Sequence, residues 1–423
     1  MAEAAEIANG YPNGHLGHLT EEEDTQLKAF RVFLEENGLY KPGPPASHDD
    51  QTLLRFLRAR KWVVKDAYEQ FRDTEEWRKK NQLDVLYDTI DVDAYEQTRS
   101  LYPQWTGRRD RRGIPLYLFQ IRHLDSTTVS KYEKDSEARN ASKAETDGST
   151  PQRLLRLFAL YENLTRFTQP LSSQLTDREA AGRTPITLST NIVDVSQVSL
   201  RMFWNLKAHM QSASTLATAH YPETLDRIFI IGAPYFFSTV WGWIKRWFDP
   251  NTVSKIFILS AAEVLPTLEK FIDLKNIPKQ YGGELDFNFF DRPNLDPHIK
   301  EVATWENGYV DFPPGPMYWV PEADGERLVC LAVGSKDGAE RRERVCTIPR
   351  TFPKVEEPTG AEAVVAAETV TEEKAAAADA STEDAIKGVE KLAVTDEELK
   401  KEVVDIVAED AQRAQQAGQT VAA

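Results

Sequence analysis

The segment 249–255 (DPNTVSK) has the residue types of a phosphate-binding helix start. Asp249 is able to cap a helix, and Pro250 suits its first turn. Thr252 and Lys255 are three residues apart, so a helix places the hydroxyl and the ammonium group on one face. A phosphate needs such donors at a helix N-terminus. An ordinary helix start has the same composition, so the segment alone leaves both readings open.

A second group of charges lies on a predicted helix over residues 53–62 (LLRFLRARKW). Arg55, Arg58, Arg60 and Lys61 place four cations within seven positions. The last two lie near the helix C-terminus, where cations complement the helix dipole. Taken alone, the pattern indicates a solvated basic face as readily as a binding site.

The third pattern is an aromatic helix face within residues 236–248. At 100° per residue, an arc of about 160° holds the large apolar side chains, while Lys245 and Arg246 fall outside it. Tryptophan beside lysine and arginine is typical of a surface that meets a bilayer interface. The same arc also suits a helix packed on a sheet. Gly232-Ala233-Pro234 interrupts the uncharged run 228–244, which therefore predicts a strand, a turn and a helix instead of a membrane span.

The common catalytic motifs are missing from the sequence. It has no G-x-x-x-x-G-K-[ST], G-x-G-x-x-G, G-x-S-x-G or H-E-x-x-H, which are the usual means of binding nucleotides, activating a serine or holding zinc. Its seven histidines show no convincing metal-ligand spacing. The sequence therefore predicts no catalytic residue, no metal site and no cofactor.

The charge distribution divides the chain into a body and a tail. Residues 355–423 hold 17 acidic and 6 basic residues, which is −11 of the net charge of −16. An acidic balance argues against general nucleic-acid binding. Cys330 and Cys346 belong to no C-x-x-C motif, and the N-terminus lacks the cationic start and apolar run of a signal peptide. These features favour a reducing, cytoplasmic compartment.

The elements that must position these groups follow from hydrophobic periodicity. A capping box at Thr20 and Glu23 opens a helical unit, and later strands alternate with helices, which is typical of an α/β domain. Residues 128–151 are polar with little periodicity and predict an insertion loop. The apolar runs 327–333 and 344–348 flank Lys336-Asp337-Gly338 and predict a β-hairpin. The expected organisation is a disordered arm (1–19), a helical N-terminal unit (20–100), the α/β domain (101–290), a β-hairpin appendage (291–353) and a disordered acidic, alanine-rich tail (354–423).

Several ordered motifs together resemble the CRAL-TRIO domain, and more narrowly the phosphatidylinositol/phosphatidylcholine transfer proteins. They are residues 53–62, Tyr221-Pro222-Glu223, 230–234 (IIGAP), 249–259 (DPNTVSKIFIL) and 277–283 (IPKQYGG). The resemblance covers roughly residues 20–290. It implies an α/β fold in which an N-terminal all-helical unit precedes a lipid-binding domain with a mixed sheet and a mobile gate helix.

The resemblance also implies which residues bind the lipid. The family's phosphoinositol headgroup site matches Arg60, Lys61, Glu223, Thr252 and Lys255. Glu223 is expected to pair with a lysine when no headgroup is present, because a buried unpaired ammonium is costly. The family's gate matches Phe236, Phe237, Val240, Trp241, Ile244, Trp247 and Phe248.

The family's phosphatidylcholine site is matched only in part. Tyr117, Tyr161 and Ser189 match it, whereas Thr106 replaces a tyrosine and Asn191 replaces a threonine. Aromatic faces hold a quaternary ammonium by cation–π contacts, so the loss of a ring weakens choline recognition. Trp105 is the alternative source of an aromatic face. The sequence predicts phosphatidylinositol binding with weak or absent phosphatidylcholine binding.

The function implied is lipid exchange without enzymatic activity. The protein is expected to load phosphatidylinositol, transfer it between membranes or present it to lipid kinases, and act as a monomer. It would be cytoplasmic and peripheral on Golgi, endosomal or endoplasmic reticulum membranes, with transient membrane contact and no nucleic-acid partner. Two alternatives stay open: a carrier of another hydrophobic ligand (a sterol, tocopherol or retinoid) and a scaffold with a vestigial pocket. A lipid esterase would need a nucleophile and base pair that the sequence does not offer.

Overall fold

The first long helix begins where the capping box predicts it. In the computed structural model, which describes residues 11, 13–178, 184–234, 236–237, 241–242, 245–247 and 250–351, Glu23 N donates to Thr20 Oγ1 and Thr20 N donates to Glu23 Oε2. This reciprocal pair satisfies two N–H groups that a helix start otherwise leaves free. The predicted capping box is therefore confirmed at the start of α2 (Glu21–Glu36).

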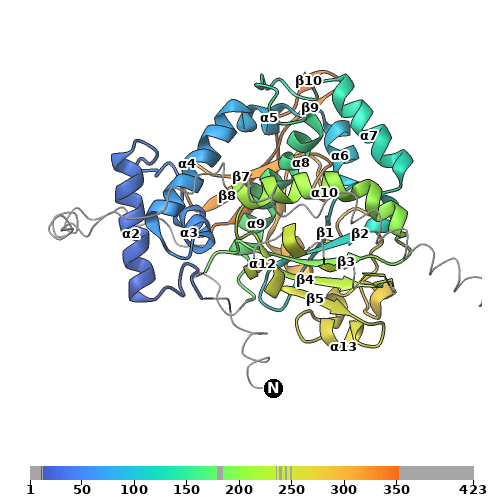
Figure 1. Ribbon diagram of the computed structural model, residues 1–423. Helices are drawn as coiled ribbons and strands as arrows, with labels where there is room; N and C mark the ends of the chain where they lie inside the picture. Colours follow the sequence, from blue (N-terminus) through green and yellow to red (C-terminus); the bar gives the residue numbers. More distant parts are fainter. Residues whose placement is uncertain are drawn as a thin grey trace, which may run out of the picture. The chain divides into compact units, whose positions relative to one another are not determined.

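Four further helices complete the N-terminal helical region, whose first helices lie at one end of the domain (Figure 1, blue). They are α3 (Asp50–Ala59), α4 (Val64–Lys80), α5 (Leu83–Thr89) and α6 (Val92–Arg99). Apolar residues spaced three or four apart form a joint core of α2, α3 and α4 that includes Phe30, Leu54 and Phe71. The basic helix of the sequence is thereby held rigidly by its apolar face.

Part of the predicted disordered arm is packed on the domain. Tyr11 and His15 are buried, and Tyr11 lies in a small core with Ile114, Ile186 and Leu188. Its hydroxyl accepts a hydrogen bond from Thr187 N at 3.1 Å. The sequence predicts disorder here because the residues that Tyr11 contacts lie more than 100 positions later in the chain, so the packing leaves no local periodicity.

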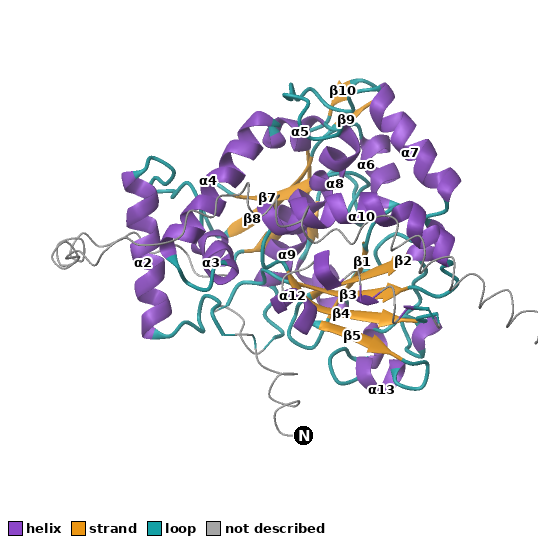
Figure 2. Ribbon diagram, in the orientation of Figure 1, coloured by secondary structure: helices purple, strands orange, loops and turns teal. Residues whose placement is uncertain are grey.

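A five-stranded mixed sheet forms the centre of the α/β domain, as predicted (Figure 2, orange). Its strands, in spatial and chain order, are β1 (Gln104–Arg109), β2 (Pro115–Gln120), β3 (Ser189–Asp194), β4 (Leu225–Ile231) and β5 (Ile256–Leu259). β1 and β2 pair antiparallel, and the other neighbours are parallel. Gly232 directly follows β4; its φ is +67°, and a Cβ there would lie 2.7 Å from the Cβ of Ser196. The predicted break in the uncharged run is thus a position that only glycine fills without strain.

Helices connect the parallel strands. After the 3₁₀ turn η1 (Ile121–His123) come α7 (Ser126–Ala138) and α8 (Gln152–Asn163), which continues through the π-helical turn η2 (Leu164–Thr168) into α9 (Gln169–Gln174). α10 (Leu200–His220) connects β3 to β4. The predicted insertion loop is wrong over α7, because Asp125 caps this helix and Tyr132 buries its ring while donating to Arg153 O. Only Tyr132 and Ser136 are buried in this helix, which leaves too weak a hydrophobic period to be read from the sequence.

Short helical turns lie around and beyond β5. They are η3 (Lys245–Trp247), α12 (Pro250–Ser254), α13 (Val264–Leu268), η4 (Leu274–Asn276), η5 (Lys279–Tyr281) and α14 (Pro297–Val302). α12 is the helix start predicted from the segment 249–255, of which Asp249 lies outside the described residues.

The predicted β-hairpin is part of a larger sheet. β8 (Arg327–Ala332) and β11 (Glu343–Pro349) pair antiparallel as expected. β6 (Thr304–Trp305) and β7 (Met317–Pro321) add an edge strand on each side, and β9 (Ser335–Lys336) and β10 (Ala339–Glu340) form the tip. The hairpin interpretation is therefore incomplete. Proline neighbours and the two-residue length of β6 hide these strands from a pattern search.

The second sheet shares a core with η2 and α9 of the α/β domain. Val345, Ile348 and Leu328 pack in one cluster with Phe167 and Leu171, so this sheet covers η2 and α9. Cys330 and Cys346 are buried, unbridged and opposite one another on β8 and β11. Across the part of the chain that the structure describes, no helix has the length and apolar character needed to cross a membrane.

Candidate functional site

The structure places all five predicted headgroup residues on one cavity of about 560 Å³. Arg60 and Lys61 follow the end of α3, Glu223 lies in the turn between α10 and β4, Thr252 lies in α12 and Lys255 directly precedes β5. These segments are far apart in the sequence. The fold therefore gathers three cations, one carboxylate and one hydroxyl around a single space.

The Glu223 carboxylate is paired with the Lys255 ammonium. Lys255 Nζ lies 3.1 Å from Glu223 Oε2 and donates to Leu225 O at 3.0 Å. Both side chains are mostly buried: 21% of the Lys255 side chain and 11% of the Glu223 side chain are exposed. The expected pairing of Glu223 with a lysine is confirmed. The carboxylate compensates the charge of the largely buried ammonium.

Three non-glycine residues on the cavity wall have left-handed backbone conformations. The φ angles are +51° at Lys61, +66° at Trp62 and +54° at Glu223. Such conformations cost about 1–3 kcal/mol each and persist where the surroundings require them. The conformations of Lys61 and Trp62 end α3 sharply, and Trp62 N donates to Leu57 O at 2.8 Å. The side chains of Arg60 and Lys61 therefore border the cavity.

Arg58 is a cavity residue whose role the sequence reasoning missed. Its Nη1 donates to Gly14 O at 2.9 Å, while its buried Nε and Nη2 have no hydrogen-bond partner among the described residues. Burial lowers the pKa of the Arg58 guanidinium to about 10. The motif 53–62 contains this arginine, but its burial depends on the packed arm around Gly14, which no local pattern indicates.

An apolar cavity of about 290 Å³ adjoins the polar one. Tyr161, Ser214, Thr224 and Leu225 line both. Most of the other wall residues are aliphatic or aromatic, contributed by β2, α8 and α10. An amphipathic ligand would therefore find a charged space and an apolar space in continuous contact.

All three predicted phosphatidylcholine residues line the apolar cavity, and so does Asn191. The Tyr117 hydroxyl donates to Thr168 Oγ1 at 3.1 Å, and Asn191 Nδ2 donates to Ser189 Oγ at 3.2 Å. Burial raises the pKa of the Tyr161 hydroxyl to about 12, so this phenol stays protonated at neutral pH.

Thr106 and Trp105 lie elsewhere. Thr106 is fully buried and donates to Leu116 O at 3.0 Å. The Trp105 ring packs edge-to-face on Phe167, with 5.9 Å between the ring centroids, in the core beneath the second sheet. Neither residue is among the described side chains that line the apolar cavity. Trp105 therefore presents no aromatic face to this cavity in the described structure.

The predicted gate segment is described in part. Phe236 and Phe237 are buried, and the Phe237 ring stacks on the half-buried Trp241 with 6.4 Å between centroids. Lys245 and Arg246 are exposed in η3, where Trp247 also lies. Val240, Ile244 and Phe248 lie outside the described residues. The described residues agree with an apolar face turned inward and a basic face turned to solvent.

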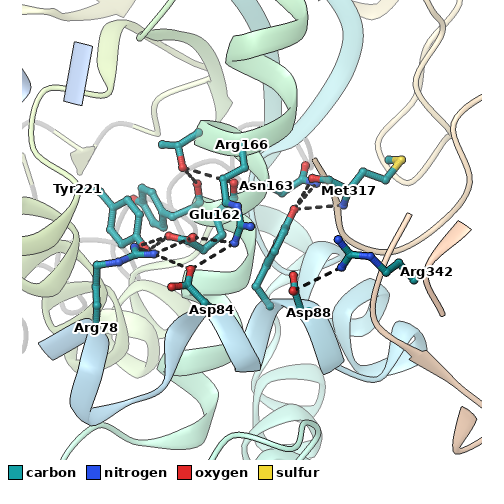
Figure 3. A network of polar contacts seen from close by, with 12 residues as sticks. Arg78, Asp84, Asp88, Glu162, Asn163, Arg166, Tyr221, Met317 and Arg342 are labelled. Atoms are coloured by element: carbon teal, nitrogen blue, oxygen red, sulfur yellow. Dashed lines mark hydrogen bonds and ion pairs between the residues drawn. The ribbon is translucent and has the colours of Figure 1, made fainter. Parts of the chain in front are cut away.

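A polar network supports the wall of the headgroup cavity at Tyr221. Figure 3 shows Arg78, Glu162 and Tyr221 converging. Arg78 binds the Glu162 carboxylate through two contacts of 2.7 and 3.1 Å, and the Tyr221 hydroxyl donates to the same carboxylate. The Arg78 guanidinium outweighs the effect of burial and lowers the pKa of Glu162. Glu162 is therefore ionised and fixes Tyr221, whose ring lines the headgroup cavity.

Comparison with known proteins gives consistent matches. Residues 99–283 match the CRAL/TRIO domain, and residues 16–73 match the CRAL/TRIO N-terminal domain. The chain is 30% identical to the SEC14 cytosolic factor of Kluyveromyces lactis over 333 residues, which is 76% of this chain and 99% of that protein. It is 28% identical to the SEC14 cytosolic factor of Eremothecium gossypii over 329 residues, or 78% of this chain and 94% of that protein.

A plant relative matches a similar share of this chain. The phosphatidylinositol/phosphatidylcholine transfer protein SFH9 of Arabidopsis thaliana is 27% identical over 337 residues, which is 77% of this chain and 54% of that protein. The two domain matches end before the second sheet, whose strands begin at Thr304.

Proposed function

Because the chain belongs to the CRAL/TRIO family, with the SEC14 cytosolic factors among its relatives, we propose that it binds phosphatidylinositol and transfers it between membranes. The observation that carries the proposal is the junction of two cavities. Arg60, Lys61, Thr252 and Lys255 border the polar cavity, and four residues connect it to the apolar one. A phospholipid has the same two-part chemistry.

In the bound complex, the phosphate and inositol would lie in the polar cavity. The phosphate replaces Glu223 at Lys255 and accepts hydrogen bonds from the Arg60 and Lys61 side chains, which are charge-assisted and short when made. The acyl chains enter the apolar cavity, where burial of their methylenes supplies about 0.8 kcal/mol per CH₂. At about 290 Å³, this cavity lies at the lower limit of small-ligand sites, ~300–1,000 Å³. Two acyl chains therefore require it to widen.

The gate segment is the natural place for that widening. Phe236, Phe237 and Trp241 are apolar groups whose exposure to water is costly. Contact with a bilayer removes that cost, so opening would be favoured at a membrane and closure in water. The protein would act as a cytoplasmic monomer that contacts membranes peripherally, without catalysis, and would exchange lipid there or present it to lipid kinases.

Two ligand classes are separated by the headgroup cations. A sterol, tocopherol or retinoid carries no phosphate, and so gives Lys255 and Thr252 no ligand to hold. Phosphatidylcholine has a phosphate, but its ammonium group also needs aromatic contacts. Tyr117 and Tyr161 match the family's positions for these contacts.

The test is identification of the bound lipid and a transfer assay. Protein purified from cells is analysed by native mass spectrometry, and transfer of labelled phosphatidylinositol between vesicles is measured. We expect bound phosphatidylinositol and transfer above the spontaneous rate. A bound sterol or tocopherol would favour the alternative carrier. An empty pocket with no transfer would favour a scaffold.

A further inference from the structure

The described part of the N-terminal arm, residues 11 and 13–18, contacts one wall of the headgroup cavity; we call it the packed arm. Arg58 and Trp62 line that cavity, whereas none of the described arm residues does. Arg58 Nη1 donates to Gly14 O at 2.9 Å. A Cβ on Gly14 would lie 3.0 Å from Trp62 Cζ2 and 3.3 Å from Arg58 Cδ. The packed arm therefore supports two cavity residues without lining the cavity itself.

The packed arm is also fixed to the α/β domain. The Tyr11 ring lies in a core with Ile186, and its hydroxyl accepts a hydrogen bond from Thr187 N at 3.1 Å. His15 Nδ1 lies 3.2 Å from Thr187 Oγ1, and the His15 ring packs edge-to-face on Tyr11 with 4.9 Å between centroids. Thr187 comes shortly before β3. The packed arm thus connects the start of a central strand to the end of α3.

Contacts within the packed arm hold the carbonyl group that meets Arg58. Gly14 N donates to His18 O at 3.3 Å, and His18 N donates to His15 O at 2.8 Å. Leu16 packs against the joint core of the N-terminal helices. The φ of Gly14 is +78°, a conformation that glycine adopts readily and other residues rarely. Gly14 is therefore suited to this turn both by its backbone and by its lack of a side chain.

The Arg58 guanidinium depends on this carbonyl. Its Nε and Nη2 are buried and have no hydrogen-bond partner among the described residues, so Gly14 O is the acceptor that the described structure gives to the group. Burial lowers the pKa of Arg58 to about 10, and the Glu223 carboxylate acts in the opposite direction. Arg58 is therefore charged at neutral pH and interacts with a headgroup residue. Loss of the carbonyl would leave buried N–H groups of a cation without any acceptor, which is costly.

We propose that the packed arm sets the affinity of the cavity for an anionic headgroup, with Gly14 as the positioning residue that holds the Arg58 charge in the cavity wall. The inference rests on the proposed function. Attraction between charges acts across a cavity without direct contact and is stronger where water is excluded. A charge that is already held in place also spares the ligand the entropic cost of ordering a side chain. The arm would thus act on the headgroup through Arg58.

Matched glycine variants of the full chain test the role of Gly14. Gly38 has a φ of +73°, and nothing lies within 4 Å of the position that its Cβ would take. Gly14→Val and Gly38→Val therefore impose the same left-handed strain on valine, but only Gly14→Val reaches Arg58 and Trp62. Equilibrium affinity is measured with phosphatidylcholine vesicles that contain labelled phosphatidylinositol. It should fall at least fivefold in Gly14→Val and stay within twofold in Gly38→Val. Equal affinity in the two variants would overturn the proposal.

Variants of Arg58 test whether the arm acts through its charge. Arg58→Gln removes the charge and should weaken phosphatidylinositol binding at least fivefold, whereas Arg58→Lys keeps the charge and should stay within threefold of the unaltered chain. An equal loss in both would indicate a packing role and overturn the proposal. The double variant Gly14→Val, Arg58→Gln should bind no more weakly than Arg58→Gln, because coupled residues are not additive. Additive losses would also overturn the proposal. If Arg58→Gln fails to fold, the two glycine variants decide alone.

The unaltered chain separates this inference from the proposed function. Phosphatidylinositol transfer by the unaltered chain, together with unchanged affinity in Gly14→Val, would overturn the inference and leave the proposed function in place. Absence of phosphatidylinositol binding and transfer in the unaltered chain would overturn both.

Discussion

The Lys255 ammonium has two acceptors to exchange for a ligand, the Glu223 carboxylate at 3.1 Å and the Leu225 carbonyl at 3.0 Å. Replacing Lys255 by alanine removes a charge-assisted contact to the phosphate, which is worth roughly 1.5–3 kcal/mol. We expect phosphatidylinositol transfer to fall at least tenfold in Lys255→Ala and in Arg60→Ala. Lys300→Ala, at an exposed lysine of α14, is the control. Vesicle transfer with melting temperature measured in parallel checks this, and normal transfer by folded Lys255→Ala would contradict the headgroup assignment.

Lipid selectivity is the second property that belongs to single residues. Tyr117 and Tyr161 line the apolar cavity, but Asn191 there adds an amide in place of a small hydroxyl residue. We expect phosphatidylinositol transfer to exceed phosphatidylcholine transfer at least tenfold in the same vesicle assay. Thr106→Tyr should not restore choline-lipid transfer. Because Thr106 is fully buried, the larger ring should instead cost about 1–3 kcal/mol of stability. Comparable transfer of both lipids would contradict the selectivity.

Two partly buried histidines, His209 and His220, make stability depend on pH. Burial lowers the pKa of His209 and of His220 to about 4. The unfolded chain binds protons near pH 6.5, so it holds more protons than the folded chain between these values. Stability is therefore complete above pH 6.5 and falls as the pH decreases toward 4. At pH 5.5 the loss should be about 1 kcal/mol for each of the two histidines.

Thermal unfolding at pH 7.0 and 5.5 measures this effect. The double variant His209→Gln, His220→Gln should lose less stability over that interval than the unaltered chain. Glu162 does not interfere, because its lowered pKa places its contribution below pH 4.5. An equal loss in both proteins would show that these side chains are not buried in the neutral form.

The residues of the headgroup cavity could be identified from the sequence because each belongs to a short motif. Arg60 and Lys61 share the segment 53–62, and Thr252 and Lys255 share one helix start. The buried guanidinium of Arg58 could not be identified as a cavity group in this way. Its burial results from contact between distant segments, namely the hydrogen bond from Arg58 to Gly14 O, and a pattern of residue types does not contain that information.

At the scale of elements, the gate is the feature with the clearest kinetic consequence. Trp241 stacks on Phe237 and is half-buried. If this segment opens at a bilayer, Trp241→Ala should slow lipid exchange several-fold and change the equilibrium affinity for lipid much less. Stopped-flow exchange with vesicles and a lipid-binding titration separate the two quantities. A structural role predicts a loss of about 3–5 kcal/mol of stability, seen as a large fall in melting temperature, with unchanged exchange kinetics.

Elements with strong periodicity were predictable, and elements formed by distant packing were not. The alternation of strands and helices in the α/β domain and the pairing of β8 with β11 were predictable from hydrophobic periodicity. α7 was missed because Tyr132 and Ser136 are its only buried residues. β6 and β7 were missed because they are short and gain their pairing from β11 and β8, which lie later in the chain.

At the scale of the whole molecule, the chain divides into a body, residues 1–356, and a tail, residues 357–423. The last described residue, Thr351, is tied to the body by Thr351 Oγ1, which donates to Gln174 O at 2.6 Å. The tail has no aromatic residue between 354 and 423 and so offers little apolar area to a core. Deleting residues 354–423 should change the melting temperature by less than ~2 °C and leave bound lipid unchanged.

Deleting residues 304–423 should have the opposite result. This longer deletion removes the second sheet and exposes the side chains of Phe167, Leu171 and Leu175, which are now fully or almost fully buried. Each exposed large apolar side chain costs about 1.5–3 kcal/mol, and the sheet loses its own buried residues as well. Since a domain is stable by only about 5–15 kcal/mol, we expect the longer deletion to yield aggregated protein without bound lipid. A folded, lipid-loaded product would show that residues 1–303 fold independently of the second sheet. Loss of bound lipid in the shorter deletion would show that the tail contributes to the body.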